Sequence, residues 1–285
     1  MHALPSEWRK WVDENVSRGV APQTLIDILV TNKFDAAVAA QAVSSATSNQ
    51  SESDNPQDAA SHASIPYQYE HAGKYAGTSV KTADREVTIL LKIDKPQVVL
   101  FGNVLSKEEC EQLMALSSPK LERSTTVDDA TGGTTVHDAR TSNGMFFKLN
   151  ENPFIAKLDH RIAQLMQVPV VNGEGLQILH YEVGGEFKPH FDYFPPDLPG
   201  SATHIAKGGQ RTATLIVYLN TVPEGGETVL PEIGLAVAPV QGNALYFSYT
   251  NSLGQLDPLS CHGGDPVIRG EKWIATKWVR EREYR

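Results

Sequence analysis

Hydrophobic residues at helical spacing mark the first 45 residues of the chain. Trp8, Trp11, Val12 and Val16 fall on one helical face. Pro22 suits the first turn of a second helix, and Asp35 can cap a third that carries Ala37, Val38 and Val43. This pattern predicts a small helical unit over residues 1–45.

The hydrophobic pattern stops in residues 46–64, "ATSNQSESDNPQDAASHAS". The segment has no Lys or Arg and almost no large apolar side chain, so it has little to bury. It predicts a flexible linker and a second domain over residues 65–285.

The second domain begins with a predicted strand in "PQVVLFGNVL" and two predicted helices. Ser106 and Glu109 have the spacing of a capping box at the start of the first helix. Asn152 can cap the second, "NPFIAKLDHRIAQLM", with Pro153 at its first position.

After Val170 the pattern changes to short apolar stretches separated by glycine-rich turns, among them "LQILHYEV", "RTATLIVYLN" and "GNALYFSY". Several short strands at this spacing are typical of an antiparallel sandwich rather than a parallel sheet. The predicted fold class is therefore α+β, mainly β: a double-stranded β-helix (jelly roll) core supported by helices, with the small N-terminal helical unit.

Composition and charge argue against several classes of protein. The net charge of −9 and the isoelectric point near 5.5 argue against a nucleic-acid binder. Cys110 and Cys261 lie far apart and suggest neither a disulfide framework nor a zinc site, which fits a cytoplasmic protein. The first residues lack the apolar core of a signal peptide, and no apolar run approaches the ~18 residues of a membrane span.

A histidine and an aspartate stand two residues apart in "EFKPHFDYF", which alternates like a strand. Residues i and i+2 of a strand share one face, so His190 and Asp192 are expected to project together. With His262 they would form the two-histidine, one-carboxylate triad of non-haem iron oxygenases. Taken alone, His190 and Asp192 at this spacing more often form a surface pair or include a hydrogen-bonded core histidine than bind a metal.

Lys272 follows in "RGEKWIATKW", where alternation places it on one strand face with Ile274 and Thr276. A lysine turned inward among apolar neighbours is costly unless it meets an anion. A dicarboxylate cosubstrate that chelates a metal at one end would supply that anion at the other.

Four stretches together carry a family resemblance: "HYEVGGEFKPHFDYF", "GGQRTATLIVYLN", "EGGETVLPEIGLAVAPVQGNALYF" and "DPLSCHGGDPVIRGEKWIATKWVRER". From about Gln97 to Glu283 the chain resembles the catalytic core of prolyl 4-hydroxylases, members of the Fe(II)/2-oxoglutarate-dependent dioxygenases. The resemblance implies Fe(II), 2-oxoglutarate and O2, with ascorbate as a reductant. It also implies hydroxylation of prolyl residues in a peptide or protein, with 2-oxoglutarate converted to succinate and CO2.

The same resemblance implies roles for individual residues. His190, Asp192 and His262 would bind Fe(II). Lys272 would pair with the distal carboxylate of 2-oxoglutarate, beside Tyr181 and Thr228. The residues implied to face or support the substrate groove are Arg140, Ser142, Glu174, Arg211 and Trp278.

Three further positions complete this reading of the sequence. Asp265 stands where family members often have Cys. His180 alternates away from Tyr181 and is interpreted as structural. His137 lies in "DDATGGTTVHDAR", which is interpreted as a loop that covers the substrate.

Two alternatives remain open at the level of sequence. The same chemistry could act on a free amino acid or another small molecule. A non-enzymatic jelly roll could bind Zn(II), Mn(II) or no metal, although Lys272 disfavours it.

Residues 1–45 resemble a ubiquitin-associated bundle, which predicts either a protein partner or dimerisation through this unit.

Overall fold

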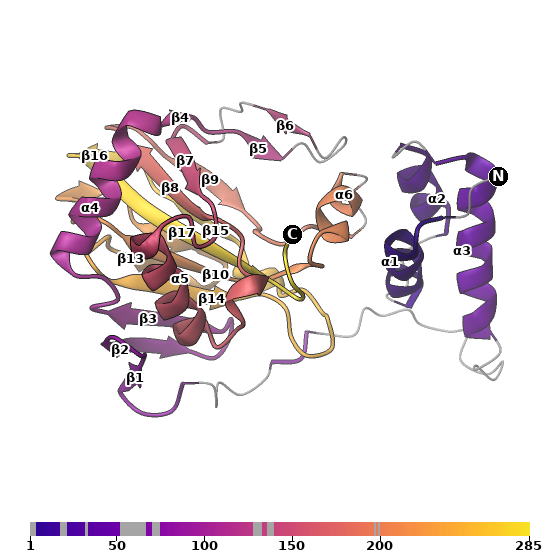
Figure 1. The fold of residues 1–285 in the computed structure, drawn as a ribbon, viewed down its shortest axis with the longest axis horizontal. Helices are drawn as coiled ribbons and strands as arrows, with labels where there is room; N and C mark the ends of the chain where they lie inside the picture. The colour runs from indigo at the N-terminus through magenta and orange to yellow at the C-terminus, as the bar shows by residue number, and fades with distance from the viewer. Residues whose placement is uncertain are drawn as a thin grey trace. The chain divides into compact units, whose positions relative to one another are not determined.

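The computed structural model describes residues 4–17, 22–31, 34–51, 67–69, 75–127, 133–135, 140–196, 198 and 200–285, and they form two compact units (Figure 1). The smaller unit contains α1 (Ser6–Ser17), α2 (Pro22–Thr31), α3 (Ala36–Ser51) and, from the middle of the chain, α6 (Ser201–Ala206). Its core includes Trp11, Leu25, Ile28 and Val43, so the predicted helical spacing does build a core.

The cap of the third helix is as predicted, but its end is not. Asp35 Oδ1 accepts hydrogen bonds from the backbone N–H groups of Ala37 and Val38, at 2.9 and 3.2 Å. The helix then continues to Ser51, into the segment predicted as linker. Thr47 is accommodated there because its hydroxyl donates to the Val43 carbonyl at 2.8 Å, one turn earlier.

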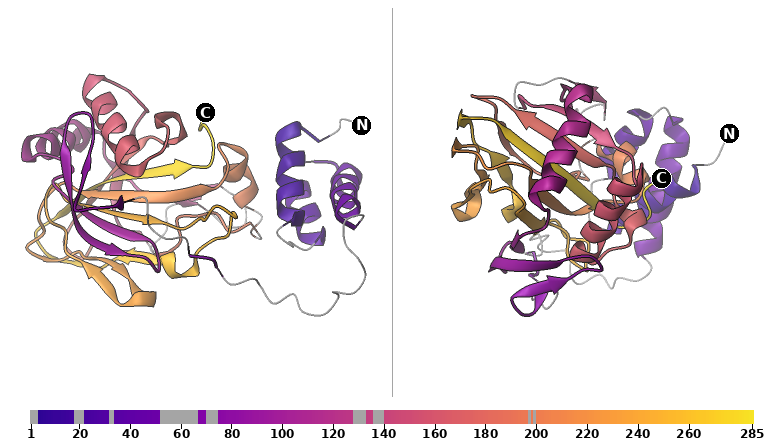
Figure 2. Two further views of the ribbon diagram at one scale, coloured as in Figure 1. Left: turned by 90° about the horizontal axis from the view of Figure 1, so that it is seen from below. Right: turned by 60° about the vertical axis from the view of Figure 1, so that its left-hand side comes forward.

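The larger unit is built on two antiparallel sheets (Figure 2). The first has nine strands, in the order β1 (Ser79–Lys81), β2 (Glu86–Ile93), β3 (Val98–Gly102), β14 (Ala244–Ser248), β10 (Arg211–Tyr218), β17 (Lys272–Arg280), β8 (Leu176–Tyr181), β7 (Asn143–Phe147) and β4 (Glu122–Arg123). The second has four strands, in the order β13 (Leu235–Val237), β12 (Thr228–Leu230), β15 (His262–Gly264) and β9 (Phe187–His190). A short pair in this unit joins β11 (Glu224–Gly225) to β16 (Val267–Arg269). A second short pair joins β5 (Thr126–Val127) to β6 (Thr134–Thr135), and residues 127–135 count with the smaller unit.

The two faces of the nine-stranded sheet bury different cores. One face packs against α4 (Lys107–Ser117) and α5 (Pro153–Met166), through residues such as Leu113 and Ile162. The other face, with Leu245 and Ile274, shares a core with Leu230 and Val237 of the four-stranded sheet. Two sheets closed over one core in this way confirm the predicted jelly roll supported by helices.

The two predicted helix starts in this unit are confirmed. Ser106 and Glu109 form the reciprocal capping box, with bonds of 3.2 and 3.0 Å. Asn152 accepts from the backbone N–H of Ile155 at 3.0 Å, and Pro153 occupies the first turn. α4 and α5 therefore begin where the sequence predicts, and both pack on the sheet face opposite the four-stranded sheet.

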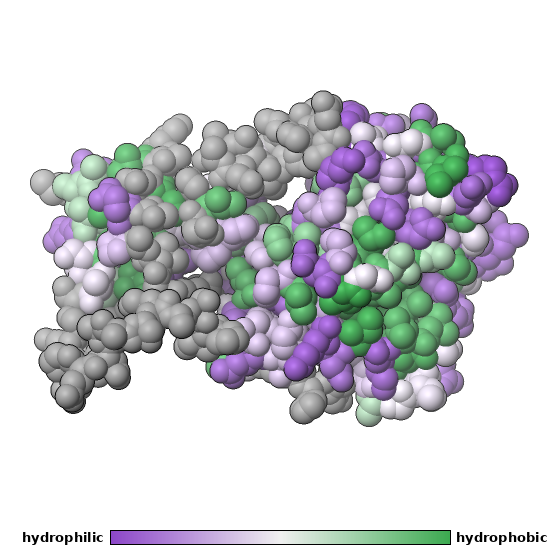
Figure 3. Space-filling view, turned by 180° about the vertical axis from the view of Figure 1, so that it is seen from behind, coloured by the Kyte–Doolittle hydropathy of each residue, from purple (hydrophilic) through white to green (hydrophobic). Residues whose placement is uncertain are grey.

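The surface of the larger unit carries both hydrophilic and hydrophobic residues. Figure 3 shows hydrophobic residues gathered on part of the face opposite the one seen in Figure 1. Among the described residues, no helix combines the length and the apolar character that a bilayer crossing requires.

Candidate metal centre and cosubstrate pocket

His190, Asp192 and His262 meet on the inner side of the four-stranded sheet. His190 ends β9 and His262 begins β15, and the two are direct partners in the antiparallel pairing of these strands. Asp192 Oδ1 lies 3.7 Å from His190 Nε2, and its Oδ2 lies 3.5 Å from His262 Nε2. One ligand atom from each of the three residues lies within 4.8 Å of the others.

The sequence placed both His190 and Asp192 within one strand, and this detail is wrong. The strand stops at His190, and Phe191 is 39% exposed, whereas Asp192 turns back into the interior and is 7% exposed. The two side chains therefore reach the same site through a bend after the strand and not through strict alternation.

Both imidazoles are oriented by backbone carbonyls. His190 Nδ1 lies 2.8 Å from the carbonyl oxygen of Lys188, and His262 Nδ1 lies 3.1 Å from that of Ser260. A carbonyl only accepts, so each Nδ1 carries a proton, and each Nε2 is the ring nitrogen that faces Asp192 and can bind a metal. Burial also lowers the pKa of His262 to about 4, which favours the neutral ring that metals bind.

Asp192 is held as a carboxylate. Thr214 of β10 donates to its Oδ2 at 2.6 Å, and Arg211 donates to its backbone carbonyl at 3.3 Å. Burial opposes ionisation, but interactions with His262 and His190 hold the pKa of the Asp192 carboxyl well below its usual range. Thr214 could not be predicted as a site residue from the sequence, because one threonine within an apolar strand carries no signal of its own.

The donor set fits a divalent metal. It offers two neutral imidazole nitrogens and one carboxylate, all on one side of the pocket, which matches the facial triad of non-haem Fe(II) sites. The carbonyl partners of both Nδ1 atoms are the kind of outer hydrogen bond that fixes metal-binding histidines.

Lys272 lies in the same pocket, at the start of β17 and opposite Tyr181 of β8. It is 4% exposed, and no carboxylate of the described residues lies within ion-pair distance of its ammonium. Burial lowers the pKa of Lys272 to about 8, although the negative charges of Asp265 and Glu227 act in the other direction and raise it. A buried ammonium without a counter-ion is ready to receive an anion.

Tyr181 and Thr228 also line this pocket, together with the apolar side chains of Leu179, Ile216 and Ile274. The Lys272 ammonium lies 5.7 Å from the centre of the Tyr181 ring. The Tyr218 hydroxyl donates to Thr228 Oγ1 at 3.0 Å, so the proton of the Thr228 hydroxyl is left to donate elsewhere.

Arg140 and Trp278 form part of the pocket wall near the three candidate ligands. Arg140 donates to the Thr125 carbonyl at 3.2 Å and to Gln177 Oε1 at 3.0 Å, and its guanidinium lies 4.9 Å from the Phe187 ring centre. Arg140 Nε and Trp278 Nε1 are both buried without a hydrogen-bond partner among the described residues. Such N–H groups are costly unless a ligand accepts from them.

The other three residues implied for the substrate groove are not in the pocket wall. Ser142 is fully buried and its hydroxyl donates to Ser124 Oγ at 2.9 Å. Glu174 accepts from Arg211 at 2.7 Å and from Arg280 at 2.6 Å. The Arg211 guanidinium lies 3.9 Å from the ring centre of Trp278, so this cluster supports the wall from behind.

The remaining histidine predictions divide in two. His180 stacks on Trp273 at 4.2 Å, bonds to Glu271 at 2.7 Å and does not line the pocket, as a structural residue should. His137 lies outside the described residues, so its assignment to a covering loop stays a prediction.

Fold and site together define a 2-oxoglutarate-dependent dioxygenase. Residues 176–280 match the family model of the 2OG-Fe(II) oxygenase superfamily. That match spans the three candidate ligands and Lys272.

Individual relatives refine the class. "Probable prolyl 4-hydroxylase 10" of Arabidopsis thaliana is 40% identical over 210 residues, which cover 67% of this chain and 71% of the relative. "Prolyl 4-hydroxylase 5" of the same plant is 39% identical over 210 residues, covering 67% and 70%. The structure of the viral collagen prolyl hydroxylase of Paramecium bursaria Chlorella virus-1, in its 2OG complex, aligns with a TM-score of 0.51 at 26% identity, covering 64% of this chain and 95% of that one. The chain belongs to the prolyl 4-hydroxylase family of 2OG-Fe(II) oxygenases.

Proposed function

We propose that this pocket hydroxylates prolyl residues of an extended peptide, with His190, Asp192 and His262 holding Fe(II) and Lys272 holding 2-oxoglutarate. The observation that carries the proposal is one pocket that holds a ligand triad and a buried lysine with no carboxylate of the described residues within ion-pair distance. The balanced reaction converts a prolyl C–H, 2-oxoglutarate and O2 to hydroxyproline, succinate and CO2. Bound Fe(II) supplies the oxidising chemistry, and the protein supplies binding and orientation.

The cosubstrate would be oriented by three polar side chains. The Lys272 ammonium pairs with the carboxylate of 2-oxoglutarate that lies away from the metal. The Thr228 hydroxyl has a free proton to donate to the same group, and the Tyr181 ring closes one side. Leu179, Ile216 and Ile274 exclude water around this ion pair, which strengthens it.

A peptide fits the opposite end of the pocket better than a free amino acid does. Arg140 Nε and Trp278 Nε1 offer buried N–H groups that match the carbonyl oxygens of a peptide backbone. Phe146, 53% exposed and 6.5 Å from the Trp278 ring, extends an apolar surface beyond the pocket. Ascorbate as reductant and a cytoplasmic location stay predictions, as does a partner of residues 1–45.

The test is turnover after anaerobic loading with Fe(II), with succinate and peptide mass followed together once O2 is admitted. Proline-containing peptides are compared with the same peptides carrying alanine in place of proline. We expect succinate and a gain of one oxygen on the proline peptide alone. His190→Ala should abolish both, whereas the matched control His180→Ala should retain them, because His180 lies outside the pocket.

Two results would change the conclusion. Oxygen gained by free proline and by no peptide would move the substrate to a small molecule. Absence of succinate with every substrate, in protein that binds Fe(II) and 2-oxoglutarate, would contradict the proposed activity.

A further inference from the structure

The short segment 67–69, which we call the strap, is hydrogen-bonded to a loop nearly two hundred positions later in the chain. The backbone N–H of Gln68 donates to Gln255 Oε1 at 2.9 Å, and its carbonyl accepts from Asn251 Nδ2 at 3.0 Å. The Tyr69 hydroxyl donates to Asp257 Oδ1 at 2.8 Å. The strap is therefore fixed to residues 251–257 along its length.

Asp257 connects this contact to a candidate metal ligand. Its Oδ1 also accepts from the backbone N–H of Leu259 at 2.9 Å, which caps the 3-10 turn η5 (Pro258–Ser260). Its backbone carbonyl accepts from the Ser260 hydroxyl at 2.7 Å. The Ser260 carbonyl is the group that orients His262 through Nδ1, at 3.1 Å.

The same loop also reaches the second candidate ligand. The backbone N–H of Asp257 donates to the Tyr249 carbonyl at 2.9 Å. The Tyr249 hydroxyl lies 3.2 Å from Thr214 Oγ1, and Thr214 donates to Asp192. Displacement of Asp257 would thus disturb both His262 and Asp192.

Asp257 depends strongly on Tyr69. The aspartate is fully buried, and its Oδ2 has no hydrogen-bond partner among the described residues. Among the described residues, the Tyr69 hydroxyl is the side-chain donor to this carboxylate. Without that hydroxyl, the buried carboxylate would keep the backbone N–H of Leu259 as its donor among the described residues, a change that favours rearrangement of the turn.

We propose that Tyr69 and Asp257 are positioning residues of the metal centre, through which the strap sets the orientation of His262. The inference rests on the proposed role of His262 as a ligand. Loss of the hydrogen bond that orients a metal-binding histidine changes metal affinity by about 10- to 100-fold, and Tyr69 acts on that bond through Asp257 and Ser260. Through these hydrogen bonds, the strap would influence the affinity of the site for its metal.

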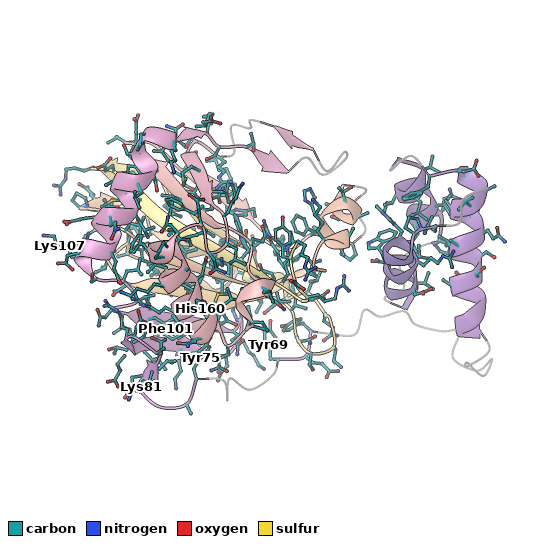
Figure 4. All side chains as sticks on the ribbon, in the orientation of Figure 1. Tyr69, Tyr75, Lys81, Phe101, Lys107 and His160 are labelled. Atoms are coloured by element: carbon teal, nitrogen blue, oxygen red, sulfur yellow. The ribbon has the colours of Figure 1, made fainter. Side chains whose placement is uncertain are left out.

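The test is equilibrium Mn(II) binding to the metal-free full-length protein, followed by the EPR signal of free Mn(II). Tyr69→Phe removes one hydroxyl and should raise the Mn(II) Kd about tenfold. Asp257→Asn should act in the same direction, and the double variant should be no weaker than the worse single variant, because both act through one bond. The matched control is Tyr75→Phe, which removes another buried hydroxyl, one that donates to the Leu165 carbonyl of α5 at 2.9 Å. Figure 4 labels both tyrosines.

The outcomes separate the two claims. An increased Kd in Tyr69→Phe with an unchanged Kd in Tyr75→Phe, at a similar loss of Tm, supports positioning. Equal Kd values in all variants, with only Tm lowered, would overturn the inference and leave the strap a purely structural contact. Failure of the parent protein to bind Mn(II) or Fe(II) would instead overturn the proposed metal site.

Discussion

β17 carries two buried lysines, Lys272 and Lys277, one on each face of the nine-stranded sheet. Lys272 and Lys277 are 4% and 3% exposed, and their odd separation turns them to opposite faces. Lys277 bonds to Asp159 of α5 at 2.7 Å, on the face covered by helices. Lys272 faces the pocket and has no carboxylate of the described residues within ion-pair distance.

The difference teaches how to separate a structural charge from a functional one. A buried charge with a fixed partner holds two elements together, as Arg161 also does with Asp84 and Glu109. A buried charge without such a partner destabilises the ligand-free protein, and its presence in a pocket indicates a ligand that completes the pair.

The largest expected effect is on cosubstrate binding by Lys272→Met. The Kd for 2-oxoglutarate should rise about a thousandfold, or about 4 kcal/mol, since one partner of a desolvated charge pair is lost. The free energy of unfolding should not fall, because Lys272 forms no ion pair with a described residue that the substitution could break. Calorimetric titration and denaturant unfolding measure the two quantities, and a large loss of stability would contradict the comparison.

Lys277→Met should show the reverse pattern. We expect the free energy of unfolding to fall by about 3 kcal/mol, because Asp159 would stay buried without its counter-charge. Binding of 2-oxoglutarate by the folded protein should be unchanged. Adding Asp159→Asn should recover part of the stability, since it removes the charge and keeps an oxygen for the Asn150 N–H.

The pocket lysine should also make cosubstrate binding depend on pH. Its pKa of about 8 means that the ammonium is present below pH 8 and lost above it. The Kd for 2-oxoglutarate should be flat below pH 8 and rise by about tenfold per pH unit above it, as the protonated fraction falls. In Lys272→Arg the rise should vanish, because a guanidinium stays protonated; a rise that persists would assign it to another group.

The smallest effect is expected at the pocket wall. Trp278→Phe removes one N–H that has no partner in the described part of the chain, so a peptide carbonyl that accepts from it would lose one hydrogen bond. The KM for a proline peptide should rise about fivefold, or about 1 kcal/mol, with the KM for 2-oxoglutarate unchanged. Steady-state kinetics with each substrate varied in turn measures both KM values. A rise in the KM for 2-oxoglutarate, with the KM for the peptide unchanged, would contradict this assignment.

Much of the fold could be predicted because local chemistry determines it. The caps at Ser106 and Asn152 and the glycine-rich turns depend on neighbours in the sequence, and the structure has them where expected. β2 was not predicted, because it is a largely exposed strand whose side chains show no regular alternation. The end of α3 was not predicted, because the serine and threonine residues after Ala46, the last α3 residue in the core, have the composition of a linker.

The candidate ligands could be predicted, but their supports could not. His190, Asp192, His262 and Lys272 carry residue types and spacings that imply chemistry. Thr214 and Asp257 act through contacts between segments far apart in the chain, which no local pattern encodes. Ser142 shows the converse: the motif implied a groove residue, and the structure gives its hydroxyl to Ser124.

Lys272 has no carboxylate partner among the described residues, and we expect it to bind the distal carboxylate of 2-oxoglutarate. The most direct measurement compares the binding of 2-oxoglutarate and of 2-oxopentanoate, which lacks that carboxylate, by the Mn(II)-loaded parent and by Lys272→Met. We predict that the parent prefers 2-oxoglutarate by about a thousandfold and that the variant loses this preference. A preference that survives in Lys272→Met would contradict the account, because another group would then hold the carboxylate.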